Sequence, residues 1–146
     1  MKTLFTLALI AVSSMAHADQ AYNCVIGLNG DQGTGHIQLY DVRNDSTLKV
    51  LKITMDTKVL RPEGGQSAGE VAHLAGVLSA QIGAQNSLSA SGSIQTSGAG
   101  MIVNPEGITL SGMIKANGDL TMQLLDDHRV LQSGYGTQVN CRPVQF

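Results

Sequence analysis

The chain has 146 residues, of which 42% are hydrophobic and 14% are charged, and its formal net charge is −2. It contains no run of lysine and arginine, so it lacks the basic surface that binds nucleic acid, and no nucleic-acid partner is expected. It has no tryptophan, three tyrosines and two phenylalanines, which excludes an aromatic platform for stacking bases or sugars. The apolar content is sufficient for one folded domain.

The first eighteen residues have the pattern of a secretory signal peptide. Lys2 gives a basic start, residues 5–12 (FTLALIAV) are apolar, and an A-H-A sequence ending at Ala18 gives a cleavage site. The apolar run is too short for a transmembrane helix, which needs about 20 residues. We predict cleavage after Ala18, a single exported domain over residues 19–146, in the periplasm or outside the cell, and no transmembrane segment in the mature chain.

Two cysteines, Cys24 and Cys141, lie close to the two ends of the predicted mature chain. Exported proteins meet oxidising conditions, and an even number of cysteines there indicates disulfide bonds. Tyr22 and Asn23, directly before Cys24, are unsuited to lipoprotein processing, which needs small residues at these positions. The sequence therefore predicts a Cys24–Cys141 disulfide, which requires the two Cα atoms to lie within about 7 Å of each other.

The first part of the chain predicts β-strands. Asn29-Gly30 is a hairpin turn signal between two of them. Farther on, Leu51 and Ile53 would point to one face, and Lys52 between them to the other, so one side of the sheet faces water. The predicted strands are residues 21–28, 36–42, 47–55 and 58–60.

Residues 64–83 fit either a helix or a strand. In a helix, Ser67 would be the N-cap and Glu70 would complete a capping box. The apolar stripe of that helix would be Val71, Leu74, Ala75, Leu78 and Ile82. The buried face of a strand would be Ala72, Leu74, Gly76, Leu78, Ala80 and Ile82. Gly76 costs a helix about 1 kcal/mol relative to alanine, yet the capping box favours a helix at about 68–83, with the strand as the alternative.

The last part of the chain predicts strands again. Residues 84–100, rich in serine, glycine and alanine, fit a flexible connection or a weak strand pair with Leu88 and Ile94 pointing inward. Asn117-Gly118 then marks the clearest hairpin turn in the chain. The strands expected here are residues 108–115, 119–125, 129–132 and 135–141.

These elements predict a mainly β domain, built as a small antiparallel barrel or sandwich with first and last strands tied by the disulfide. Pairing the first strand with the last would also remove open sheet edges. Interior residues would include Leu51, Ile53, Ile108 and Leu124. Such residues either line a cavity for a small apolar ligand or simply fill the core, and filling is usual in small barrels.

One short motif suggests catalysis. Residues 65–69 (GQSAG) match G-x-S-x-G, which in α/β-hydrolases exposes a serine on a sharp turn, and Asp119 and His128 follow in the chain order of that triad. The parallel sheet that such an enzyme needs is not predicted, and capping of a helix explains Ser67 equally well. The motif therefore remains a secondary hypothesis, and no catalytic residue is assigned.

The remaining titratable residues do not form a recognisable site. Asp126-Asp127-His128 reads as a solvated turn, because zinc needs three or four converging ligands, and His36 and His73 are expected at the surface. The chain has no complete calcium loop, nucleotide-binding loop or C-x-x-C motif, so no metal or cofactor is expected.

The resulting hypothesis is a non-enzymatic module that binds a protein or a small apolar ligand. The alternatives are a subunit of a cell-envelope surface assembly and a small hydrolase that uses Ser67.

Overall fold

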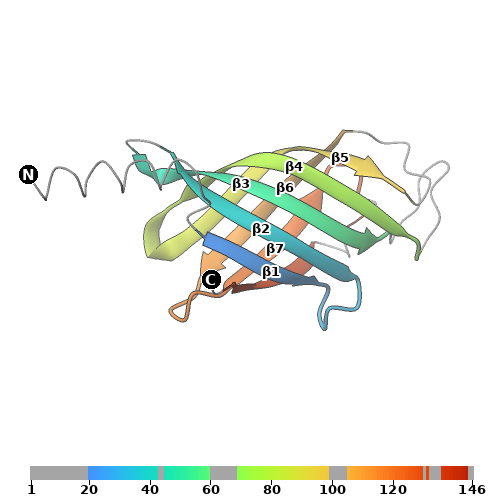
Figure 1. Cartoon of the computed structure of the whole chain (residues 1–146), viewed down its shortest axis with the longest axis horizontal. Coiled ribbons are helices and arrows are strands. Elements are labelled where there is room, and N and C mark those ends of the chain that lie inside the picture. Colours follow the sequence, from blue (N-terminus) through green and yellow to red (C-terminus); the bar gives the residue numbers. More distant parts are fainter. Residues whose placement is uncertain are drawn as a thin grey trace, which may run out of the picture.

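The computed structural model describes residues 20–42, 45–59, 69–98, 105–129, 131 and 136–144. Within these residues, eight antiparallel strands close into a barrel in which each strand pairs with its sequence neighbours and β1 pairs with β8 (Figure 1). The strands are β1 (Gln20–Ile26), β2 (Gly33–Val42), β3 (Asp45–Lys58), β4 (Val71–Ile82), β5 (Ser87–Ser97), β6 (Glu106–Ile114), β7 (Leu120–Asp126) and β8 (Thr137–Pro143). The predicted leader at 1–18 and Ser67 lie outside the described residues.

The predicted disulfide joins the first and last strands. Cys24 and Cys141 are direct partners in the β1–β8 register, their Sγ atoms are bonded, and their Cα atoms are 4.0 Å apart. Both side chains are buried. The bond spans 117 residues of sequence, so it covalently holds the seam at which the two ends of the barrel sheet meet.

Apolar side chains point into the barrel at every second position. Along β7, Leu120, Met122, Leu124 and Asp126 are buried, whereas Gln123 and Leu125, which alternate with them, are exposed, as the period of a strand requires. The largest fully buried apolar side chains are Ile26, Ile37, Leu51, Ile53, Leu78, Leu88, Ile94, Leu110, Leu120, Leu124 and Leu131. They belong to one continuous cluster, which also includes Ile108, so the four predicted interior residues fill a core.

The expectation of a helix at 68–83 is wrong, because β4 occupies Val71–Ile82 as a strand of twelve residues. Leu74 and Leu78, four positions apart, fit the period of a helix and of a strand equally well. Val71 and Ala75, which the helix would bury, are exposed. Gly76 suits the barrel, because a Cβ at this position would lie 2.7 Å from Cγ2 of Ile94. Pairing with β3 and β5 outweighs the local capping signal.

Two neighbouring segments also differ from the sequence-based expectation. Lys58 ends β3, in which the alternation of inward side chains continues through Thr57, and Val59 is not in a strand. The separate strand expected at 58–60 is therefore not formed in the described part of that range. The serine-rich segment forms one regular strand, β5, which pairs with both β4 and β6. Leu88 and Ile94 point inward on it, as the strand alternative required.

A glycine in β6 allows the backbone of the neighbouring strand to approach closely. Gly112 of β6 pairs with Met122 of β7, and a Cβ on Gly112 would lie 1.9 Å from the carbonyl oxygen of Thr121. No other residue type allows the neighbouring backbone to come so close. The predicted Asn117-Gly118 hairpin is confirmed between these two strands, with Lys115 N–H donating to the Asp119 carbonyl at 2.8 Å.

The two ends of the barrel differ in the length of the connections between their strands. One end carries the short connections between β2 and β3, β4 and β5, and β6 and β7. The other, called here the loop end, carries the connections 27–32, 59–70, 98–105 and 127–136. Arg129 and Leu131 are not in a strand, so the strand expected at 129–132 is not formed in the described part of that connection. Leu131 is instead fully buried in the core.

Candidate functional site

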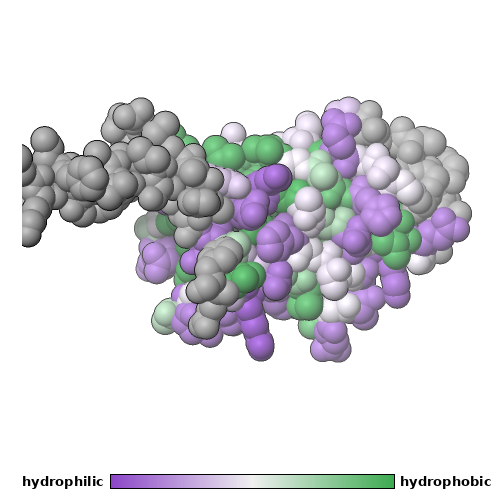
Figure 2. Space-filling view, in the orientation of Figure 1, coloured by the Kyte–Doolittle hydropathy of each residue, from purple (hydrophilic) through white to green (hydrophobic). Residues whose placement is uncertain are grey.

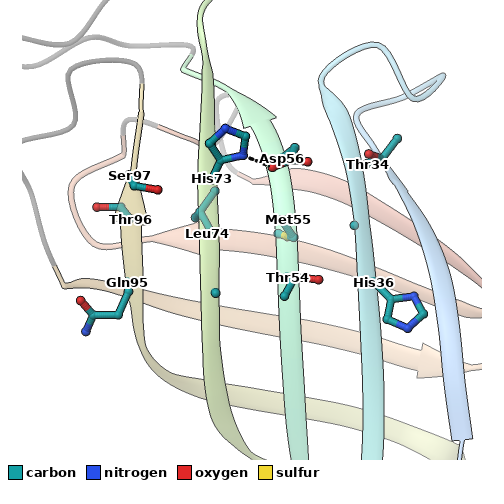
Figure 3. Close-up of a pocket in the computed structure, with 12 residues that line it drawn as sticks. Thr34, His36, Thr54, Met55, Asp56, His73, Leu74, Gln95, Thr96 and Ser97 are labelled. Carbon is teal, nitrogen blue, oxygen red and sulfur yellow. Dashed lines mark hydrogen bonds and ion pairs between the residues drawn. The ribbon is translucent and has the colours of Figure 1, made fainter.

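Outward side chains of β2 to β5 form two parallel polar rows near the loop end. The first row, in cross-strand register, is His36, Thr54, Ala75 and Gln95. The second is Thr34, Asp56, His73 and Ser97. Directly opposite residues on neighbouring strands bring their side chains together. A hollow of about 490 Å³, called here the wall hollow, lies over these eight residues (Figure 3).

The wall hollow has the size and the mixed lining of a small-molecule site. Known sites of this kind occupy about 300–1,000 Å³ and combine apolar surface with a few polar groups. Ala75 contributes only a methyl group between Thr54 and Gln95, which keeps the centre of the hollow open. Met55 and Leu74 also border the hollow, but their side chains are buried in the core behind it. Hydroxyl, amide, imidazole and carboxylate groups line the hollow itself.

His73 and Asp56 form the direct side-chain contact within this hollow. Nδ1 of His73 contacts Oδ1 of Asp56, as the dashed line in Figure 3 marks. In the tautomer with the proton on Nδ1, His73 donates to the carboxylate of Asp56, and Nε2 is the acceptor nitrogen. Both side chains are well exposed, at 63% and 57%. His36 points elsewhere, since its Nδ1 pairs with Oδ1 of Asn23 at 2.9 Å.

A second polar cluster is buried at the loop end. It consists of Gln32, Thr57, Thr96, Glu106, Asp126 and Thr137. Gln32 Nε2 donates to Thr57 Oγ1 at 3.0 Å and to the Leu131 carbonyl at 2.5 Å, and Thr137 Oγ1 donates to Gln32 Oε1 at 3.2 Å. The Leu131 N–H donates to the Asp126 carboxylate at 3.3 Å. The backbone N–H and the carbonyl of Leu131 therefore both have hydrogen-bond partners, which position this residue at the loop end of the barrel.

Glu106 is the least satisfied member of this cluster. Its side chain is fully buried, Oε1 pairs with Nδ1 of His128 at 2.9 Å, and Oε2 has no partner among the described residues. Burial raises the pKa of Glu106, the hydrogen bond with His128 lowers it, and the nearby Asp126 carboxylate raises it again. The net effect is a raised pKa, so Glu106 ionises less readily in the folded barrel than in the unfolded chain.

The hydrolase triad suggested by the GQSAG motif is not assembled in the described structure. Ser67 lies outside it. Asp119 lies in the turn before β7 and His128 lies beyond the other end of β7, so the strand separates them. The cysteines form the disulfide, and His36 and His73 lie on the outer wall as predicted.

The expectation of a solvated turn at residues 126–128 is wrong in part. Asp126 is buried beneath Leu131, and His128 pairs with the buried Glu106. Asp126 is the last residue of β7, and its side chain points inward like those of the other alternate residues of the strand. The turn therefore begins one residue later than predicted. Among the described residues, no three His, Cys, Asp or Glu side chains converge as metal ligands would.

Comparisons with protein-family models, with curated proteins and with solved structures find no match to this chain. In the part of the chain that the structure describes, no helix is long and apolar enough to cross a membrane.

Proposed function

We propose that this chain is an exported, disulfide-closed barrel that binds a small, partly polar molecule in the wall hollow. The observation that carries the proposal is the hollow itself, in which two rows of polar side chains surround a small central residue, Ala75. The interior is occupied by packed apolar side chains, which favours a site on the outer wall over the apolar interior site considered from the sequence.

Export is supported by two independent features of the chain. The leader at 1–18 has a basic start, an apolar run and a small-residue cleavage site. The Cys24–Cys141 disulfide belongs to oxidising compartments such as the periplasm or the extracellular space. The wall hollow would then meet molecules outside the cytoplasm.

The polarity of the outer wall is consistent with a barrel surrounded by water, and it therefore supports binding of a water-soluble ligand. Figure 2 shows hydrophilic residues over most of the visible face, with separate hydrophobic patches among them. Barrels that span a bilayer instead carry a continuous apolar outer band. In the described barrel every strand is paired on both sides, which gives no support to assembly by strand addition and favours binding over the envelope-assembly alternative.

Replacing Ala75 with tryptophan is expected to abolish ligand binding. The exposed indole would occupy the centre of the wall hollow while leaving the core untouched. The measurement is a native mass spectrum of protein taken from its exported compartment without reductant. We expect the mass of residues 19–146 less two hydrogens, plus an increment that gentle activation removes from the wild type and that Ala75→Trp lacks.

The matched control is Ser79→Trp, on the same strand and the same outer face. Ser79 pairs with Val50 and Ser91 and lies outside the hollow, so this variant should keep the increment. A wild type without any increment, or an increment that Ala75→Trp retains, would contradict the proposed binding site.

A further inference from the structure

We propose that Ser97 is a nucleophile toward small esters, activated by His73 and Asp56. The three residues lie on adjacent strands in one row, with Asp56 of β3 opposite His73 of β4, and His73 opposite Ser97 of β5. All three line the wall hollow. The inference rests on the proposed binding site and names the chemical class of its ligand.

Asp56 contacts one edge of the His73 ring, and the other edge lies beside Gly98. Nδ1 contacts Asp56 on the β3 side. The opposite edge faces the end of β5, because a Cβ built on Gly98 would lie 3.3 Å from Cδ2 and 3.9 Å from Nε2 of His73. Nε2, the nitrogen that Asp56 does not engage, therefore lies beside the residue that follows Ser97.

Ser97 is within side-chain reach of that nitrogen. Directly opposite residues of an antiparallel pair have Cβ atoms about 5 Å apart, and Figure 3 shows the Ser97 hydroxyl on the side of β5 that faces β4. No hydrogen bond between Ser97 and His73 is formed in the described structure. Such catalytic hydrogen bonds are often long before substrate binds, so a rotation of the two side chains would complete the contact.

The row supplies the groups of an acyl-transfer mechanism. Nε2 of His73 takes the proton of Ser97 Oγ while Oγ bonds to the ester carbonyl carbon, and Asp56 stabilises the imidazolium. The bond from that carbon to the alkoxy oxygen then breaks, and the alcohol leaves with the proton from Nε2. Water attacks the acyl-serine, passing one proton through Nε2 back to Oγ. The products are an acid and an alcohol, and no oxidant or reductant is needed.

Other lining residues match the parts of an ester. Thr54 and Gln95 carry side-chain donors that line the same hollow and can stabilise the negative oxygen of a tetrahedral intermediate. Ala75 lies exposed on the same outer face, and its methyl group gives apolar surface for a small acyl group. A small ester combines polar and apolar parts, and this lining offers both.

The test uses the full-length mature protein with its disulfide intact. It is incubated with a fluorophosphonate probe, and peptide mass spectrometry locates the adduct. We expect the adduct on Ser97, its loss in Ser97→Ala, and a labelling rate that falls about a hundredfold in His73→Ala. Asp56→Asn should also slow labelling. All three side chains are exposed, so the variants should keep the wild-type melting temperature, which circular dichroism checks.

Ser91→Ala is the matched control, because Ser91 is also exposed on β5 but pairs with Ser79 and Thr109 rather than an imidazole. Its labelling should equal that of the wild type. No adduct, an adduct on another serine, or labelling unchanged in His73→Ala would overturn the proposal.

Different outcomes would contradict the binding site in the wall hollow and the nucleophilic role of Ser97. Ser97→Ala should lose the adduct and keep the removable mass increment, since it leaves the hollow open. An increment that Ala75→Trp abolishes, without labelling of Ser97, rejects the nucleophile alone. Labelling of Ser97 without any increment rejects the binding proposal alone.

Discussion

Replacing Cys24 and Cys141 together with alanine will lower the free energy of unfolding by about 4 kcal/mol. The disulfide closes a sequence separation of 117 residues, and a loop of this size constrains the unfolded chain by about 4–5 kcal/mol in the entropic account of crosslinks. Both side chains are also buried, so the smaller alanines leave space in the core. Urea unfolding of the wild type and the double variant, without reductant, measures the difference.

Two further measurements separate the crosslink from loss of packing. Reductant should destabilise the wild type and leave the double variant unchanged. In the described barrel, β1 and β8 are the paired strands that are distant in sequence, so loss of the bond should first expose their amides to hydrogen exchange. Destabilisation below about 1 kcal/mol, or uniform loss of protection over all strands, would contradict a role for the bond in holding the seam.

The disulfide could be predicted from the number of cysteines, and the mainly β fold could be predicted from local sequence patterns. Two cysteines in one chain allow one intramolecular pairing, and that pairing alone requires the first strand to lie beside the last. Alternation around Leu51 and Ile53 and the Asn117-Gly118 turn identified the strands and a hairpin. A closed barrel satisfies both signals, because it joins its ends and leaves no sheet edge.

The strand β4 was predicted as a helix because the spacing of its largest residues fits the period of a helix and that of a strand. Leu74, Leu78 and Ile82 recur every four positions, which fits a helix and a strand alike. The decisive contribution is pairing with β3 and β5, a non-local interaction that no sequence window contains. Gly76, counted against a helix, proved to be the informative residue, since Ile94 packs where its side chain would be.

The wall hollow could not be derived from the sequence for a related reason. Asp56, His73 and Ser97 lie on three different strands, and they share a row because of the register between those strands. A shift of one residue in either pairing would move one of them to the interior face. Local motifs therefore drew attention to Ser67, and the constellation on the wall was missed.

The buried Glu106, by contrast, left a signal that could have been used. It stands two positions before Ile108 and four before Leu110, so the alternation of β6 places all three on the inner face. Pro105 and Gly107 favour a turn just before Ile108. This turn signal hides the true start of the strand, which the sequence predicts only from Ile108. The structure begins β6 at Glu106, which extends the inward phase to a carboxyl group.

Glu106→Gln will raise the free energy of unfolding by about 2 kcal/mol at pH 8, because it removes a buried negative charge that is only partly hydrogen-bonded. The pKa of Glu106 in the folded state lies above its ordinary value of 4.5 because of burial. Below that ordinary value the carboxyl is protonated in both states, and it costs the fold no charge. As pH rises, the unfolded chain ionises first, so wild-type stability falls until pH passes the raised folded pKa, and it is constant above.

The measurement is the pH dependence of the difference between wild type and variant from urea unfolding between pH 3.5 and 8. Taking the difference removes the titration of all other groups that do not contact Glu106. The gap should be smallest at the acidic end and grow with pH. Glu70→Gln is the control, because Glu70 is exposed, and its effect should stay below about 0.5 kcal/mol at every pH.

His128→Ala tests the same carboxyl from the opposite side. The hydrogen bond with His128 lowers the pKa of Glu106, so its removal should raise that pKa further and extend the pH-dependent loss of stability to higher pH. In the double variant with Glu106→Gln, this extension should vanish, because no ionisable group remains at position 106. A gap between wild type and Glu106→Gln that is largest at pH 3.5 would mean that the barrel stabilises the ionised carboxylate instead, and that a partner for Oε2 is present in solution.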